Sequence, residues 1–145
     1  MTKHLPTSEA EKLRCGDIVV VPFPFSDKLA EKRRPALVVS GDLLSQEGMV
    51  WLVMITSARK TKGAHDCAIP DPFACGLNVA CVVRPTKMTG VEPTRILRRT
   101  GRLGARETNV VLASVRAFIG KEIAVASPKS KSVVKKSKTK AAQDT

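Results

Sequence analysis

The sequence is organised around Lys32-Arg33-Arg34-Pro35-Ala36-Leu37-Val38-Val39-Ser40. Pro35 fixes its own φ angle and disfavours the helical conformation at Arg34, so we expect Arg34 to be presented in extended form from a loop. The apolar run at residues 36–39 is typical of a strand that is buried on both faces. Two adjacent arginines alone more often mark a solvated loop. At the entrance of a rigid, buried strand, however, they are placed as binding or catalytic arginines usually are.

Other short apolar runs predict further strands, at residues 18–21, 50–55 and 79–83, with a short edge strand at residues 67–70. Proline removes a backbone donor, so we expect Pro22 to stop the first of these strands and Pro85 the last. Residues 43–46 can form one helical turn. Residues 86–106 are mostly polar and predict no regular element.

One segment, residues 106–119, has the periodicity of an amphipathic helix. Its expected apolar stripe consists of Val111, Leu112, Val115, Phe118 and Ile119. Gly104 is an acceptable N-cap, and Gly120 should close the C-terminus. Short strands followed by one helix predict a mainly β protein with one C-terminal helix, in which the helix lies against a small barrel.

The chain of 145 residues suits one domain. We expect a flexible arm at residues 1–14, the barrel domain at residues 15–126 and a disordered, lysine-rich tail at residues 127–145. Within the barrel domain, residues 122–126 could form a last short strand or a simple extension.

The charge of the chain is strongly positive, with a formal net charge of +12. Six lysines and one acid in residues 127–145 contribute +5 of this, so the rest of the chain still carries +7. Such a balance indicates an anionic partner, which could be nucleic acid, an acidic protein or a membrane surface. There is no apolar run of about 18 residues and no signal peptide, so we expect a cytoplasmic protein without a membrane anchor.

The four cysteines, Cys15, Cys67, Cys75 and Cys81, are irregularly spaced and form no Cys-x-x-Cys pair. Only His4 and His65 could assist them as ligands. Zinc sites need tighter pairing than this, so we expect reduced, mostly buried thiols and neither a metal nor a cofactor.

Three motifs occur in order: Gly16-Asp17-Ile18-Val19-Val20-Val21-Pro22-Phe23-Pro24-Phe25, then Arg33 to Ser40, then Ile55-Thr56-Ser57. With them the chain resembles the MazF/PemK family, the toxins of type II toxin–antitoxin pairs. The likeness continues through Gly76-Leu77, Val82-Val83-Arg84-Pro85-Thr86-Lys87 and Gly101-Arg102-Leu103 into the predicted helix. Each motif is weak alone, but their order and spacing together are specific.

The resemblance implies an SH3-like β-barrel of the PemK/MazF type that forms a homodimer and cleaves single-stranded RNA at specific sequences without a metal. The family's catalytic arginine corresponds to Arg34 and its catalytic threonine to Thr56. Arg33, Ser57, Arg59, Lys60 and Lys87 are the candidate substrate-binding residues. One PemK branch is described with a further acid, for which Asp66 is the nearest candidate. A cognate antitoxin would cover Arg34 and the basic loops.

These residue types suit metal-free RNA cleavage, in which the ribose 2′-OH attacks the adjacent phosphorus. A planar guanidinium can bind two phosphate oxygens and gains strength as negative charge develops on them. Arg34 is therefore the expected stabiliser of the transition state, and Thr56 can donate a hydrogen bond to a phosphate oxygen. No histidine matches a motif position, so the sequence offers no strong general base.

Other interpretations remain open at this point. Thr56 and Ser57 alone would usually bond to nearby backbone, and Trp51 more often packs in a core than stacks on a base. The arginines between residues 95 and 106 could follow an RNA backbone, receive an acidic antitoxin segment or form a solvated face. A non-catalytic nucleic-acid-binding barrel, or a gyrase-directed toxin of the same fold, would have similar sequence features.

Overall fold

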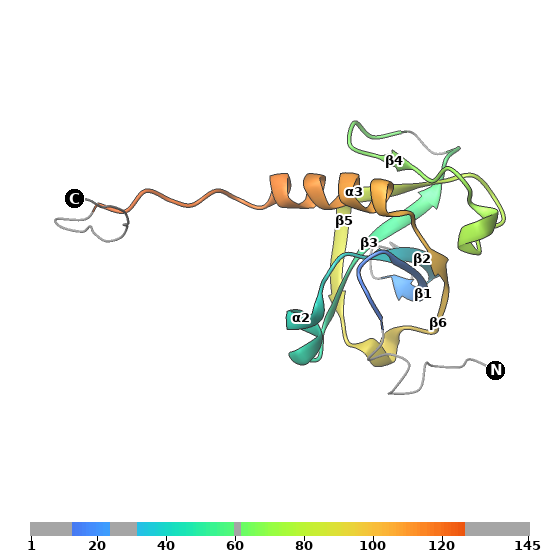
Figure 1. The fold of residues 1–145 in the computed structure, drawn as a ribbon, viewed down its shortest axis with the longest axis horizontal. Coiled ribbons are helices and arrows are strands. Elements are labelled where there is room, and N and C mark those ends of the chain that lie inside the picture. Colours follow the sequence, from blue (N-terminus) through green and yellow to red (C-terminus); the bar gives the residue numbers. More distant parts are fainter. Residues whose placement is uncertain (1–12, 24–31, 60–61, 127–145) are drawn as a thin grey trace.

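The computed structural model describes residues 13–23, 32–59 and 62–126. The expected tail at residues 127–145 and most of the expected N-terminal arm lie outside these ranges. Within them, six antiparallel strands form one curled sheet in the order β4-β5-β3-β2-β1-β6 (Figure 1). The strands are β1 (Asp17–Phe23), β2 (Lys32–Val38), β3 (Val50–Ser57), β4 (Cys67–Ala68), β5 (Cys81–Val91) and β6 (Arg98–Arg102).

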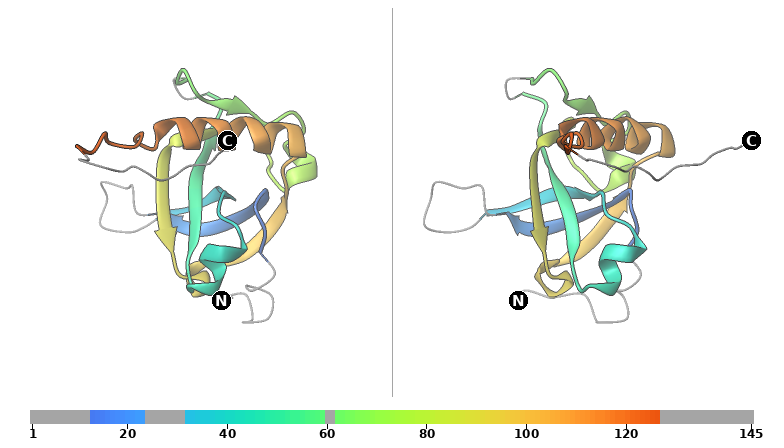
Figure 2. Two further views of the ribbon diagram at one scale, coloured as in Figure 1. Left: turned by 60° about the vertical axis from the view of Figure 1, so that its left-hand side comes forward. Right: turned by 90° about the vertical axis from the view of Figure 1, so that its left-hand side faces the viewer.

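The helix α3 (Ala105–Phe118) lies across one end of the curled sheet, as two further views show (Figure 2). The remaining elements are short: the helix α2 (Asp42–Gln46) and the 3-10 turns η1 (Phe73–Cys75) and η2 (Pro93–Arg95). The prediction of a mainly β fold with one long C-terminal helix is confirmed. The single turn expected at residues 43–46 and the short edge strand after residue 66 are also present.

Two apolar clusters bury the sheet on both faces, because its strands carry nearly continuous apolar runs. Ile18, Leu37 and Val53 belong to the cluster that also contains Val111 and Val115 of α3. Their neighbours Val19, Ala36, Val38 and Leu52 belong to the cluster inside the curl, together with Leu13 and Ile96. The expectation of a strand buried on both faces is therefore confirmed for Ala36, Leu37 and Val38.

Two prolines that we expected to end strands lie within them. β1 continues through Pro22, which pairs with Arg33 of β2. The backbone carbonyl of Val20 accepts a hydrogen bond from the N–H of Leu97, so the backbone of Val20 faces the β6 side. The backbone of Pro22, two residues further on, faces the same side, but the pairing of β1 with β6 ends at Val20. No described strand pairs with β1 on that side at Pro22, so the backbone N–H that proline lacks is not needed there.

Pro85 is accommodated by an irregularity in β5. Arg84 pairs with Met54 and Met88 pairs with Val53, so the three residues between Arg84 and Met88 bulge out of the ladder. Bulges are among the few places where a sheet tolerates proline. β5 therefore continues to Val91, eight residues beyond the end that we predicted.

The position of the paired arginines also differs from the prediction. β2 begins at Lys32, so Arg33 and Arg34 lie inside the strand rather than in a loop. Pairing with β1 explains this, since Val21 lies opposite Arg34 and Pro22 opposite Arg33. The extended conformation expected before Pro35 is correct.

β6 was not predicted, because its sequence, RRTGR, has no apolar alternation. Backbone pairing with β1 forms this strand. The buried Asp17 at the start of β1 adds ion pairs to Arg102 at 2.5 Å and to Arg99 at 3.5 Å. The two free edges of the curled sheet then meet through η1, where the hydroxyl of Thr100 donates to the carbonyl of Cys75 at 3.1 Å.

The C-terminal end of α3 departs from the expected stripe. Val111 and Val115 are buried, but Phe118 and Ile119 are exposed, because the helix extends beyond β5 (Figure 1). The helix ends at Phe118, and residues 122–126 form no strand.

Candidate active site

A cleft of about 530 Å³ opens at the seam where η1 meets β6. β2 and β3 each contribute three consecutive residues, Arg33 to Pro35 and Ile55 to Ser57. β6 contributes Arg98 and Thr100, and residues 76–79 form the wall that follows η1. The lining holds three arginines and no acidic side chain, so the cleft carries a positive charge.

Arg34 and Thr56 meet in this cleft because of the register of β2 on β3. The last pair toward the cleft is Ala36 with Met54. The same register, continued by two residues, places Arg34 opposite Thr56. Thr56 is buried and is itself paired with Val82 of β5, which holds it in place.

Arg34 and Arg98 have no local counter-charge within the described ranges, and they differ in this respect from Arg84, Arg99 and Arg102, which form ion pairs with Asp66 or Asp17. Among the described residues, neither Arg34 nor Arg98 has a side-chain hydrogen bond or an ion pair. The hydroxyl of Thr56 likewise has no partner in the described part of the chain. Two guanidinium groups and a buried hydroxyl in an acid-free cleft can bind an anionic group such as a phosphate.

The wall at residues 76–79 is held close to β6 by two glycines. Gly76 has a φ of +80°, and a Cβ there would lie 2.5 Å from the carbonyl oxygen of Thr100. A Cβ on Gly101 would lie 2.7 Å from backbone atoms of Cys75. Side chains at these positions would force the seam apart, so glycine at both positions determines the width of the cleft.

The predicted site residues divide into two groups. Arg33, Arg34, Thr56 and Ser57 line the cleft, whereas Arg59 and Lys87 do not. Arg59 lies just outside, where its backbone N–H donates to the Ser57 hydroxyl at 3.2 Å. Lys87 is exposed in the β5 bulge, and Lys60 lies outside the described residues.

Sequence reasoning missed Arg98, Thr100 and most of the wall. Arg98 belonged to an arginine-rich stretch in which no residue stood out. Only Gly76-Leu77 carried a signal, as part of the family resemblance.

Asp66, the nearest candidate for a further acid, does not reach the cleft. Its carboxylate accepts from the Arg84 guanidinium at 2.7 and 3.1 Å and from the backbone N–H of Gly63 at 2.7 Å. The hydrogen bonds from Arg84 lower the pKa of Asp66, and the same pairing raises the pKa of Arg84. Asp66 therefore anchors the end of the loop between β3 and β4 to β5.

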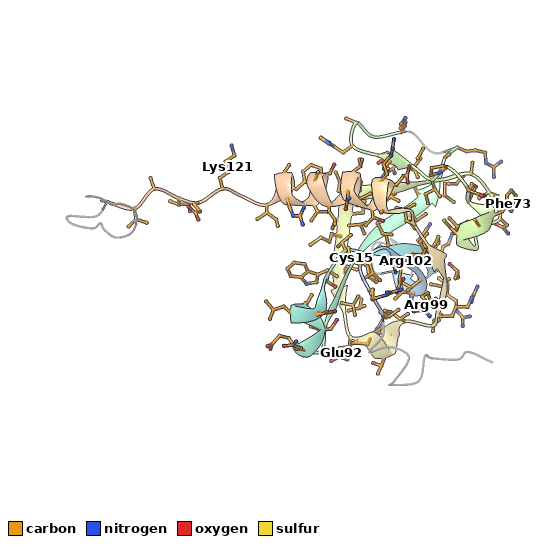
Figure 3. The ribbon with its side chains drawn as sticks, viewed as in Figure 1. Cys15, Phe73, Glu92, Arg99, Arg102 and Lys121 are labelled. Atoms are coloured by element: carbon orange, nitrogen blue, oxygen red, sulfur yellow. The ribbon has the colours of Figure 1, made fainter. Side chains whose placement is uncertain are left out.

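The arginines between residues 95 and 106 do not act as one cluster. Arg98 lines the cleft, whereas Arg99 and Arg102 do not and instead pair with Asp17. Figure 3 shows Arg102 beside Cys15, with Arg99 nearby. Asp17 is only 2 % exposed and also accepts from the backbone N–H of Arg14 at 2.8 Å. Arg102 in addition donates to the carbonyl of Cys15 at 3.3 Å.

Trp51 does not pack in the core as we expected, since it is 40 % exposed. It lies opposite Gly90 of β5, where a Cβ would approach the indole Cδ1 to 3.2 Å. The indole and the end of the Met49 side chain therefore both lie close to Gly90. Trp51 is at the far end of β3 from the cleft, so it takes no part in the site.

All four cysteines are free, and burial raises the pKa of each thiol. Cys75 and Cys81 are buried, whereas Cys15 and Cys67 are half-buried, so the expectation of mostly buried thiols holds for two of the four. Within the described ranges, no group of three or more His, Cys, Asp or Glu side chains could hold a metal ion. Nor is any helix there long and apolar enough to cross a membrane.

Comparison with known proteins adds independent findings. The family described as PemK-like, MazF-like toxin of type II toxin–antitoxin system matches residues 14–119. A search of curated protein sequences finds no match.

Several solved structures are similar in fold. In the MazE–MazF complex (Form II) from Deinococcus radiodurans, the similar chain has a TM-score of 0.57 and 20 % identity, over 76 % of this chain and 97 % of that one. The Mycobacterium tuberculosis toxin MazF-mt6 has a TM-score of 0.53 and 21 % identity, over 68 % and 90 %. An endoribonuclease in complex with its cognate antitoxin from a mycobacterial species has a TM-score of 0.54 and 16 % identity, over 75 % and 99 %. At these identities the likeness establishes the fold, and it confirms the expected barrel type.

Proposed function

The chain belongs to the family of PemK-like, MazF-like toxins of type II toxin–antitoxin systems, and from this premise we propose that it is an endoribonuclease that cleaves single-stranded RNA without a metal ion. One observation carries the proposal: Arg34 and Thr56 line the same acid-free cleft. The family's catalytic arginine and threonine correspond to these two positions.

In the proposed reaction, the ribose 2′-oxygen attacks the adjacent phosphorus, and the bond from phosphorus to the 5′-oxygen breaks. The 2′-OH loses its proton and the departing 5′-oxygen gains one. The Arg34 guanidinium binds the non-bridging oxygens as their charge increases, and Thr56 donates a hydrogen bond to one of them. DNA, which lacks the 2′-OH, is not a substrate.

The described lining of the cleft contains no histidine, aspartate or glutamate. The proposal therefore assigns electrostatic stabilisation to the protein and names no residue as general base. This observation also favours a second candidate, a barrel of the same fold that binds RNA through its charge and does not cleave it.

Further residues fit roles in substrate binding. Arg33, Ser57 and Arg98 can contact backbone phosphates inside the cleft, and Arg59, Lys60 and Lys87 can do so around it. Sequence preference would come from the segments that flank these residues, 26–31 before β2 and 59–66 after β3. Binding that depends on so many cations should weaken steeply as salt increases.

The proposal extends to partners and location. A cognate antitoxin is supported by the solved MazE–MazF complexes of similar fold, and an acidic segment of it would suit the cleft. We place the protein in the cytoplasm as a homodimer that inhibits growth when free. A pull-down that retains no small acidic protein, even with the neighbouring reading frame co-expressed, would contradict the antitoxin part.

The test is cleavage of a long single-stranded RNA in excess EDTA, with mapping of the new 5′ ends. Arg34→Ala should reduce the rate by about 10²–10³-fold and Thr56→Ala should also reduce it. Arg106→Ala and Thr94→Ala, both at exposed positions away from the cleft, are matched controls that should cleave like the wild type. Intact RNA that still binds the wild type would reject the enzyme and favour the binding module.

A further inference from the structure

The wall of the cleft, residues 76–79, presents one polar side chain, the amide of Asn78. Asn78 is exposed, and within the described ranges its amide makes no hydrogen bond. Val79, the next residue, also lines the cleft and is 45 % exposed. The wall therefore offers a ligand an amide beside an apolar side chain, and the fold uses neither of them.

Backbone hydrogen bonds fix this wall on both sides of Asn78. Before it, the N–H of Leu77 donates to the carbonyl of Pro72 at 2.8 Å, and the Leu77 side chain is buried. After it, the N–H of Ala58 donates to the carbonyl of Ala80 at 2.9 Å, which ties the wall to the chain at the end of β3. A side chain on such a segment is held in place before a ligand arrives, as selective recognition requires.

The amide of Asn78 adds a carbonyl acceptor to a cleft whose cations only donate. Guanidinium groups carry N–H donors and no acceptor, and an ionised phosphate carries only acceptors, so the arginines alone match the RNA backbone. An asparagine amide carries an N–H donor beside a carbonyl oxygen. A ligand that pairs with both atoms must present an acceptor beside a donor, and the base edges of single-stranded RNA do so.

The remainder of the cleft suits a base as well as a phosphate. Its volume of about 530 Å³ lies in the range of about 300–1,000 Å³ found for sites that enclose small organic ligands. Three apolar residues line it together with Val79, namely Val20, Pro35 and Ile55. Arg98 lines it too, and the flat face of a guanidinium can stack on a base. Apolar and flat surfaces beside one amide are the surroundings in which a nucleobase is bound and distinguished.

We propose that Asn78 is a specificity-determining residue that binds the edge of one adenine in the RNA, with Val79 against the base. Adenine carries an N6 donor beside the N7 acceptor, the pair that an asparagine amide matches with two hydrogen bonds. Guanine presents two acceptors at the same edge, O6 and N7, which suit an arginine instead. The inference rests on the proposed function for its ligand, RNA. It adds a base contact inside the cleft to the arginine and the threonine that act on the phosphate.

The experiment measures binding to oligonucleotides that cannot be cleaved because they lack the 2′-OH, so it does not depend on activity. Four fluorescent 2′-deoxy strands of uracil, which differ only in a central A, C, G or U, are titrated with the full-length protein, and anisotropy gives the Kd. The wild type should bind the strand with A at least about fivefold more tightly than the other three. Asn78→Ala should bind all four alike. Asn109→Ala, the same change at an exposed position on α3 outside the cleft, should keep the wild-type preference.

Asn78→Asp sharpens the test, because a carboxylate accepts hydrogen bonds and donates none. This variant should lose the preference for adenine and favour guanine, whose N1–H and N2–H₂ are adjacent donors. Both asparagines are exposed, so the variants should fold, which circular dichroism checks.

The inference is overturned if the wild type shows no base preference or prefers another base, or if the preference for adenine survives in Asn78→Ala. It is also overturned if Asn109→Ala loses the preference equally. RNA cleavage is measured separately, in EDTA. A preference for adenine that depends on Asn78, in a protein that leaves RNA intact, would reject the proposed activity and support this inference. Cleavage by a wild type whose base preference Asn78→Ala does not change would do the reverse.

Discussion

β6 presents two adjacent arginines, Arg98 and Arg99, whose surroundings differ in charge. Arg98 lines the cleft with Arg34, in surroundings without an acid. Arg99, the next residue, joins Arg102 around the buried carboxylate of Asp17. An arginine paired with an acid uses its hydrogen-bond donors to stabilise the fold. An arginine without a counter-charge has donors available for a ligand. The net charge of a segment therefore does not indicate which of its cations are available for binding.

The largest effect should come from replacing one arginine of each kind, Arg34 in the cleft and Arg102 beside Asp17. Arg34→Ala should lower the RNA cleavage rate by about 10²–10³-fold with little change in stability. Arg102→Ala should do the reverse, lowering the free energy of unfolding by about 1–2 kcal/mol while the cleavage rate stays within about twofold of the wild type. Single-turnover cleavage and urea denaturation of the same preparations measure the two effects. Equal losses of cleavage in both variants would show that the distinction is wrong.

The next largest effect should come from replacing Asp17, whose carboxylate neutralises Arg99 and Arg102. Asp17→Asn keeps the shape of the side chain but removes the charge that Arg99 and Arg102 share, and it weakens the acceptor for the N–H of Arg14. We expect a loss of about 2–3 kcal/mol in the free energy of unfolding, measured by urea denaturation. Asp42→Asn, at an exposed position on α2, is the control and should change it very little. A stable Asp17→Asn protein would mean that β6 is held by backbone pairing alone.

The smallest effect on stability should come from breaking the ion pair of Arg84 with Asp66. Because Arg84 lowers the pKa of Asp66, the unfolded chain takes up a proton on this residue before the folded protein does. The stabilisation is complete above the ordinary aspartate pKa of about 4 and is lost as the pH falls through the lowered value. Asp66→Asn should cost about 1 kcal/mol near neutral pH and progressively less in acid. A cost that does not change with pH, in denaturation between neutral and acidic buffers, would exclude the ion pair as its cause.

Most of the fold could be anticipated from particular residues. The valine-rich runs at residues 18–21, 36–39 and 50–55 predict buried strands because only a sheet covered on both faces hides such runs. The spacing of Val111 and Val115 predicts the helix for the same reason. Pro22 and Pro85 misled the prediction, since proline is compatible with a strand wherever the partner on that side is missing or a bulge intervenes.

The candidate site could be anticipated only in part. Arg34 and Thr56 carry a signal because each lies next to an apolar run within a motif of the family. Arg98 carries none, because its role depends on which way β6 faces once it has paired with β1. Residues 122–126 could form a last short strand or a simple extension on the evidence of the sequence, and the structure shows that they form no strand.

Residues close together in the chain already indicate much about this protein: the places of most strands and of the long helix, the basic charge of the barrel, and the family to which the chain belongs. These properties depend on residues close together in the chain, through apolar periodicity, backbone restriction and total charge. The tertiary structure alone decided which arginines are neutralised and which line the cleft. Asp17 lies 85 residues from Arg102, and a contact over that separation exists only once the sheet has curled and its edges have met.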